Sequence, residues 1–140
     1  MSILITTPYD YKPLNRVSVD GTRFYVDPNN NKLPSVTTIL DKTKDKTFLN
    51  EWKKRVGEKE AVRISTEAAG LGTLVHTHLE KYVLGEDRPS GTNVVHQMAK
   101  AMSDVVIDKG LSQVSEVWGS EVSLYYPDLY AGTSDLVGLY

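Results

Sequence analysis

The chain has no cysteine, which excludes disulfide bonds and thiolate metal sites and suits a reducing, cytoplasmic setting. It also lacks any apolar run near the roughly 18 residues that a membrane span requires, so we expect no membrane association. No excess of one charge is present, because 16 Lys and Arg stand against 18 Asp and Glu, for a net charge of -2. A nucleic-acid binder of this composition needs its basic residues gathered locally.

What the chain does contain is typical of a soluble globular protein. Its 140 residues are 40% hydrophobic and 24% charged, which predicts one domain with a buried core. Three segments follow one another. Residues 1–34 hold a β-hairpin around Asp20-Gly21, residues 35–110 are helical, and residues 111–140 form a strand pair. The fold class predicted from this order is α+β.

Local signals predict where several elements begin and end. Ser35 and Thr47 are predicted to be N-caps. Gly57 is predicted to break or bend a helix, and Gly85 to follow the end of another. Gly70 and Gly72 predict an interruption between helices, followed by a separate helix over residues 73–84. Thr92 or Asn93 opens a last helix that ends at Gly110. Two alternating runs, 114–126 and 129–140, predict strands joined by a turn at Pro127-Asp128.

A few residues are candidates for metal chemistry. His76 and Glu80 share a helix face, and a hydrogen-bonded pair at the edge of the core explains them as well as a metal site does. Asp135 lies in a strand, where aspartate is disfavoured, so it is either a surface residue on an edge strand or a ligand facing a cleft. Glu121 and Thr133 are candidates for the same cleft. Gly72, with Thr73 after it, would let a phosphate approach the start of a helix.

Four segments together resemble one family: LPSVTTIL (33–40), FLNEWKKRVGEKEA (48–61), GTLVHTHLEKYV (72–83) and EVSLYYPDLYAGTSDLVGLY (121–140). In this order and spacing they are similar to the RecB-like PD-(D/E)xK nucleases, particularly phage exonucleases that resemble the mitochondrial genome maintenance exonuclease. The resemblance implies a restriction-endonuclease-like core, preceded here by the hairpin and the helical region. A phage-encoded chain would act in the host cytoplasm.

The resemblance also implies roles for single residues. Asp135 and His76 would bind Mg²⁺ or Mn²⁺, and Glu80 would support His76 in a catalytic site that hydrolyses DNA at ends or in single strands. Contacts to nucleic acid would come from a Ser/Thr pair and a basic helix, at Ser35, Thr37, Lys53, Lys54 and Arg55. The basic run is otherwise an ordinary solvated helix face.

One part of the family pattern is not found in this sequence. The family has Asp-x-Lys or Glu-x-Lys on a strand after the one that bears Asp135, whereas the sequence reaches Leu139-Tyr140 where the intervening turn would start. We therefore expect an incomplete core that is nearly inactive alone. A complementary fragment bearing Asp-x-Lys, or a homodimer, would cover the open sheet edge. The alternative is a non-catalytic remnant of the fold that binds nucleic acid or a partner.

Overall fold

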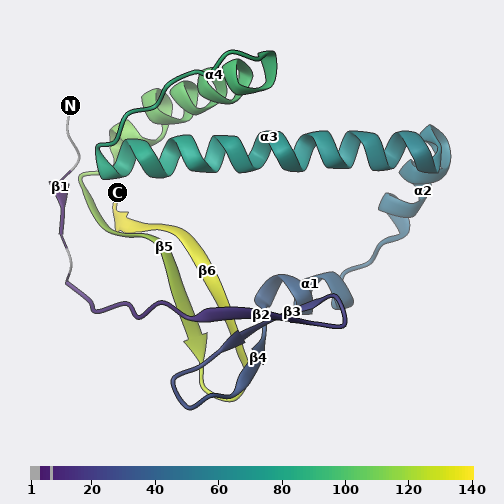
Figure 1. Ribbon diagram of the computed structural model, residues 1–140, viewed down its shortest axis with the longest axis horizontal. Coiled ribbons are helices and arrows are strands. Elements are labelled where there is room, and N and C mark those ends of the chain that lie inside the picture. Colours follow the sequence, from purple (N-terminus) through teal and green to yellow (C-terminus); the bar gives the residue numbers. More distant parts are fainter. Residues whose placement is uncertain (1–3, 7) are drawn as a thin grey trace. The chain divides into compact units, whose positions relative to one another are not determined.

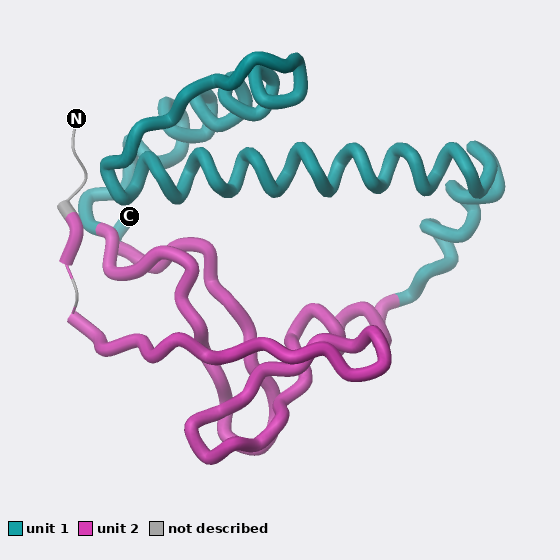
Figure 2. The backbone as a smooth tube through the Cα atoms, viewed as in Figure 1, with its two compact units in different colours: residues 1–4, 45–116, 139–140 teal, residues 5–44, 117–138 magenta. Residues whose placement is uncertain are grey.

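The computed structural model describes residues 4–6 and 8–140 and contains both helices and strands, which confirms the α+β class (Figure 1). By its internal contacts the chain forms two compact units. One consists of residues 5–44 and 117–138 and is called the strand unit. The other consists mainly of residues 45–116 and is called the helical unit (Figure 2). No helix in the described part of the chain is long and apolar enough to cross a membrane.

The strand unit begins with the predicted hairpin. Strands β2 (Asn15–Val19) and β3 (Thr22–Val26) pair antiparallel, and β4 (Lys32–Pro34) pairs with the other edge of β3. Asp20 and Gly21 have φ values of 50° and 76°, the left-handed pair that a type I′ turn requires. The hairpin prediction is therefore confirmed.

Helix α1 (Val36–Thr43) follows β4, and Ser35 is its N-cap as predicted. The Ser35 hydroxyl accepts a hydrogen bond from the Thr38 backbone N–H at 3.0 Å, which satisfies one of the free amides at the start of the helix. Ser35 also forms a parallel bridge with Ala131. This bridge joins two segments that are distant in sequence at the core of Tyr25, Leu33 and Ala131.

Strands β5 (Glu116–Tyr126) and β6 (Tyr130–Leu139) are neighbours in a second sheet with the order β1-β5-β6, where β1 is Leu4–Ile5. The turn between β5 and β6 lies at Pro127-Asp128, as predicted. Leu129 donates its N–H to the Tyr126 carbonyl at 3.1 Å, and Asp128 has a φ of 64°. Proline followed by a residue with positive φ is the pattern of a type II turn. Strand β6 is an edge strand of this sheet.

The helical unit contains α2 (Thr47–Val56), α3 (Glu58–Leu84) and α4 (Val94–Lys109), followed by the short 3₁₀ helix η1 (Leu111–Gln113). Gly57, with a φ of 92°, separates α2 from α3. Helix α2 begins at Thr47, but its N-cap position is Lys46, one residue before the predicted one. Asn93 caps α4, and Gly85 closes α3 in the left-handed conformation, both as predicted.

The prediction of a separate helix over residues 73–84 is wrong, because α3 continues through Gly70 and Gly72 without a break. A glycine inside a helix costs roughly 0.5–1 kcal/mol relative to alanine, which is too little to end a helix whose other face is packed. The packed face lies against α4, where Ala99 and Ser103 are fully buried.

Candidate metal and nucleic-acid site

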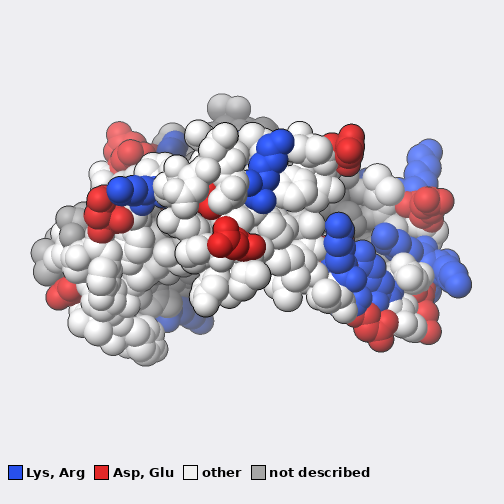
Figure 3. All heavy atoms as spheres, turned by 90° about the horizontal axis from the view of Figure 1, so that it is seen from below, with Lys and Arg blue, Asp and Glu red and all other residues white. Residues whose placement is uncertain are grey.

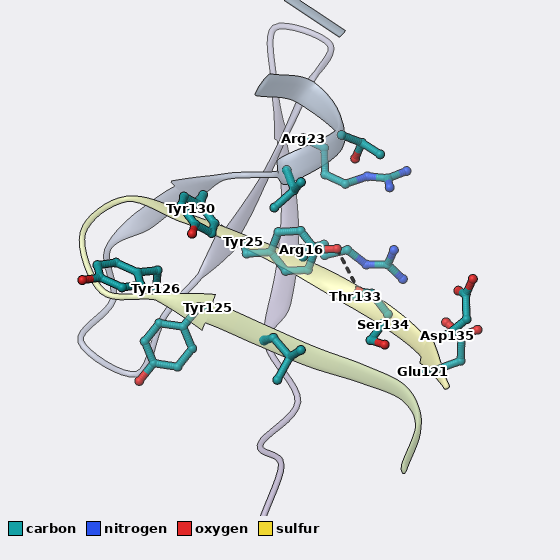
Figure 4. A pocket seen from close by; sticks show the side chains of 14 residues that line it. Arg16, Arg23, Tyr25, Glu121, Tyr125, Tyr126, Tyr130, Thr133, Ser134 and Asp135 are labelled. Carbon is teal, nitrogen blue, oxygen red and sulfur yellow. Dashed lines mark hydrogen bonds between the residues drawn. The ribbon is translucent and has the colours of Figure 1, made fainter. Parts of the chain in front are cut away.

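Two acidic side chains meet in the strand unit. Glu121 comes from β5 and Asp135 from β6, and each offers a carboxylate oxygen that lies within 4.8 Å of the other. Both residues are exposed to solvent, and Figure 4 shows their carboxylates side by side. Two negative charges this close repel each other, and a divalent cation between them would remove that repulsion.

Glu121 reaches Asp135 through an unusual backbone conformation. Its φ is 52°, in the left-handed region, although it lies within strand β5. For a residue with a side chain this conformation costs roughly 1–2 kcal/mol. Left-handed residues occur in some β-bulges, which redirect the local side chain. Sequence alternation alone did not predict this conformation.

The carboxylate pair lies at the rim of a hollow of about 680 Å³ within the strand unit. Arg16, Arg23 and Tyr25 line it from the β2–β3 hairpin (Figure 4). Thr37 lines it from α1. The hairpin register explains this grouping. Arg16 is opposite Tyr25, and Arg23 is two residues before Tyr25, so all three side chains lie on one face.

A hydrogen bond fixes the hairpin to strand β6 beside the carboxylates. The hydroxyls of Tyr25 and Thr133 lie 2.9 Å apart, and Tyr25 is buried. Thr133 lines the hollow together with Asp135, and so does Ser134 between them. The predicted cleft residues Glu121 and Thr133 therefore share one hollow with Asp135, and the hollow also contains two arginines.

His76 and Glu80 belong to the helical unit, on α3. His76 is exposed, so the expectation that it lies at the edge of the core is wrong, and Glu80 is half-buried. The buried histidine is His78, which is only 8% exposed. The structure thus brings Glu121 and Asp135 together within one unit and places His76 and Glu80 on the other.

His78 lies on the packed face of α3. Its burial lowers its pKa below the ordinary value, and the positive charges of Arg88 and Lys100 lower it further. Its Nδ1 atom is buried and has no hydrogen-bond partner among the described residues. Burial without a partner favours the neutral imidazole, so His78 is a packing residue of the helical unit.

The predicted nucleic-acid contacts have different surroundings. Thr37 is exposed at the hollow, whereas the Ser35 hydroxyl is buried in its capping hydrogen bonds. Gly72 lies in the interior of α3, so the expectation of a phosphate site at a helix start there is wrong. Thr73 donates its hydroxyl to the Ala69 carbonyl one turn earlier, at 3.0 Å.

The predicted basic residues Lys53, Lys54 and Arg55 form the last turn of α2 and are exposed. Cations at this end complement the partial negative charge of the helix C-terminus, which is a structural reason for their position. On the face drawn in Figure 3, several Lys and Arg side chains gather toward one end, with Asp and Glu side chains beside them.

Sequence reasoning missed Arg16, Arg23 and the tyrosines of the hollow. The available signal was the Asp-Gly turn, because its two-residue hairpin register already places Arg16 and Arg23 on the same face as Tyr25. No local signal connects this face to Asp135. That connection depends on packing between segments more than a hundred residues apart.

Comparisons of the chain with known protein families, with curated proteins and with solved structures return no match.

Proposed function

We propose that Glu121 and Asp135 hold a divalent cation, Mg²⁺ or Mn²⁺, and that the site acts on the phosphodiester backbone of DNA. The observation that carries this proposal is the approach of the two carboxylates to within 4.8 Å at the rim of a hollow that contains two arginines. Carboxylate oxygens are the ligands that both ions prefer. The arginines suit the phosphate, because guanidinium groups bind phosphate oxygens with two parallel hydrogen bonds.

In this reaction the cation and the side chains of the hollow would have different roles. A bound cation would polarise the phosphodiester and activate a water molecule. Arg16 and Arg23 would orient the phosphate and stabilise its developing charge. Thr37, exposed at the hollow, adds a hydroxyl that can donate to a phosphate oxygen.

The proposal includes His76 as a further ligand, supported by Glu80 one turn later on α3. Imidazole is acceptable to Mn²⁺ and poorly suited to Mg²⁺. His76→Ala should therefore weaken Mn²⁺ binding roughly tenfold and leave Mg²⁺ binding nearly unchanged. Mn²⁺ binding that is unchanged in His76→Ala would remove His76 from the site. The restriction-endonuclease-like core belongs to the same proposal, with β5 and β6 as its first strands.

Cation binding tests the site directly. Isothermal titration with Mn²⁺ should show one site in the unaltered chain, weakened at least roughly tenfold by Asp135→Asn or Glu121→Gln. Asp128→Asn is the matched control, because Asp128 is an exposed acid in the β5–β6 turn and asparagine also accepts its φ of 64°. If the control and Asp135→Asn bind Mn²⁺ equally, the site is wrongly assigned.

Activity is a separate test. The family resemblance places Asp-x-Lys or Glu-x-Lys on a strand after β6, and β6 is an edge strand able to accept a neighbour. We expect Mn²⁺-dependent degradation of labelled DNA when a polypeptide carrying such a strand is present, and its loss with Asp135→Asn. Degradation that persists in Asp135→Asn would refute the nuclease assignment.

A second candidate is nucleic-acid binding without chemistry, and the two arginines in the hollow favour it. Such binding would fall with rising salt, because phosphate contacts release counterions. It would also be indifferent to EDTA and to Asp135→Asn. Salt titrations with and without EDTA therefore separate the two candidates.

A further inference from the structure

The hollow continues from the carboxylates to a group of tyrosines at the β5–β6 turn. Tyr125, Tyr126 and Tyr130 line it and are 43%, 57% and 42% exposed. Leu124 and Leu129 are exposed in the same stretch. Solvated strand ends rarely carry so much aromatic surface, and a contiguous exposed apolar patch of this kind marks a binding surface.

The tyrosine rings form an ordered face. Tyr126 and Tyr130 stack with centroids 5.9 Å apart and an interplanar angle of 26°. The type II turn at Pro127-Asp128 brings their backbones together, so the two rings need little further ordering when a ligand binds. Figure 4 shows Tyr125, Tyr126 and Tyr130 near the turn, the carboxylates of Glu121 and Asp135 farther along the strands, and Arg16 and Arg23 between them.

We propose that Tyr126 and Tyr130 stack on unpaired bases of single-stranded DNA whose backbone runs past Arg16 and Arg23 toward Glu121 and Asp135. This inference rests on the function proposed above and specifies its substrate. Aromatic rings joined to a basic groove are the usual means of binding single strands without sequence preference. Within a duplex the base faces are already stacked, so only its terminal base pairs could use such a face.

The strand geometry sets the length of DNA that the site needs. Tyr130 and Asp135 are five residues apart on β6, which corresponds to roughly 16 Å at about 3.3 Å per residue. A single nucleotide cannot reach from the tyrosines to the carboxylates over this distance. Affinity should therefore rise steeply between one nucleotide and a short oligonucleotide, and then level off.

The test is fluorescence anisotropy with labelled oligothymidylate, in EDTA so that the cation plays no part. Tyr126→Ala combined with Tyr130→Ala should weaken binding roughly tenfold or more. The corresponding double change to phenylalanine should stay within roughly twofold, because stacking uses the ring and not the hydroxyl. Tyr140→Ala is a control for a tyrosine outside the hollow, since Tyr140 is 89% exposed.

An oligonucleotide without bases provides a second test of stacking, one that needs no protein variant. The unaltered chain should bind this abasic strand as weakly as the double alanine variant binds oligothymidylate, and the alanine changes should cause no further loss on it. This second test decides the question even if the alanine variant does not fold, as judged by circular dichroism. Equal binding of abasic and normal strands by the unaltered chain would overturn the inference.

The outcomes distinguish this inference from the proposed function. Tyrosine variants that leave DNA binding unchanged, while Mn²⁺ binding still requires Asp135, would refute the stacking face and spare the cation site. Binding that requires the tyrosines while Mn²⁺ does not bind would refute the cation site and support the stacking face. Affinity that is equal for one nucleotide and for longer strands would also overturn the inference.

Discussion

At the scale of single residues, Glu121 holds a φ of 52° within strand β5, a left-handed conformation that few residues with a side chain adopt. The same residue supplies one of the two carboxylates of the candidate cation site. Strained residues persist where the surrounding structure overrides local preference, and they cluster at functional positions. The conformation of Glu121 therefore supports the proposal that its side chain serves the cation site.

Comparing two substitutions isolates this strain. Glu121→Gly and Glu121→Ala remove the same carboxylate, but only glycine adopts the left-handed region without a steric cost. Glu121→Gly should therefore have a free energy of unfolding about 1 kcal/mol higher than Glu121→Ala in urea denaturation. Both variants should lose Mn²⁺ binding. Equal stabilities would mean that the backbone at residue 121 is not held in this conformation.

Asp104 on α4 gives a pH-dependent prediction in the helical unit. It accepts hydrogen bonds from Arg88 at 2.8 Å and from Lys100 at 3.1 Å. The bond from Arg88, followed by that from Lys100, lowers the pKa of Asp104 below its ordinary value. The unfolded chain then binds the proton more tightly than the folded chain, so the stabilisation is present above about pH 4 and is lost as the pH falls further.

Asp104→Asn should accordingly lower the free energy of unfolding by about 0.5–1 kcal/mol at pH 7, a small value because the carboxylate is half-exposed and screened. The difference from the unaltered chain should shrink as the pH falls below about 4 and the carboxylate takes up a proton. Chemical denaturation at pH 7 and at a series of acidic pH values measures it. A difference that is constant with pH would show that packing, and not charge, is the cause.

At the scale of elements, α3 is a single helix with open space where side chains at Gly70 and Gly72 would begin. A Cβ added at either position meets no heavy atom within 4 Å among the described residues, the glycine's immediate neighbours and nearby helix backbone aside. Helix signals on both sides outweigh two glycines, because helix formation is cooperative once nucleated. The prediction of a helix break at these glycines was wrong because it gave too much weight to the low helix propensity of single residues.

Replacing these glycines should strengthen α3. Gly70→Ala and Gly72→Ala should each raise the free energy of unfolding by about 0.5–1 kcal/mol. Gly57→Ala and Gly85→Ala are the matched controls, because their φ values of 92° and 73° disfavour alanine, and they should lower it by about 1 kcal/mol. The melting temperatures of the four variants test this, and a loss at Gly72 would reveal an approach that only glycine permits.

At the scale of the whole molecule, the strand unit is assembled from two segments, 5–44 and 117–138, that are separated by the entire helical unit in sequence. The Tyr25–Thr133 hydrogen bond and the Ser35–Ala131 bridge connect them. Because these contacts are within one packed unit, they should hold the segments together when the chain between them is cut.

A site for a sequence-specific protease, inserted after Lys44, tests this. Lys44 is exposed between α1 and α2, where an insertion interrupts no regular element. After complete cleavage, the two fragments should co-elute in native size-exclusion chromatography with an unchanged circular dichroism spectrum, and they should separate in denaturant. Separation under native conditions would contradict the assembly of the strand unit.

The sequence by itself determined the elements of this protein and many of their ends. The Asp20-Gly21 hairpin, the caps at Ser35 and Asn93, the stop at Gly85 and the turn at Pro127 all depend on neighbouring residues, so local chemistry is sufficient to predict them. Asp135 was selected in the same way, as an acid in a strand.

Only the tertiary structure decided which side chains meet. The left-handed conformation of Glu121, and the placement of Arg16 and Arg23 beside Asp135, follow from packing between segments far apart in the chain. The burial of His78 in place of His76 has a similar origin, because the face of α3 that is buried depends on where α4 packs. Whether such contacts form depends on the favourable burial and the unfavourable strain summed over the whole unit. No short stretch of sequence is sufficient to predict that sum.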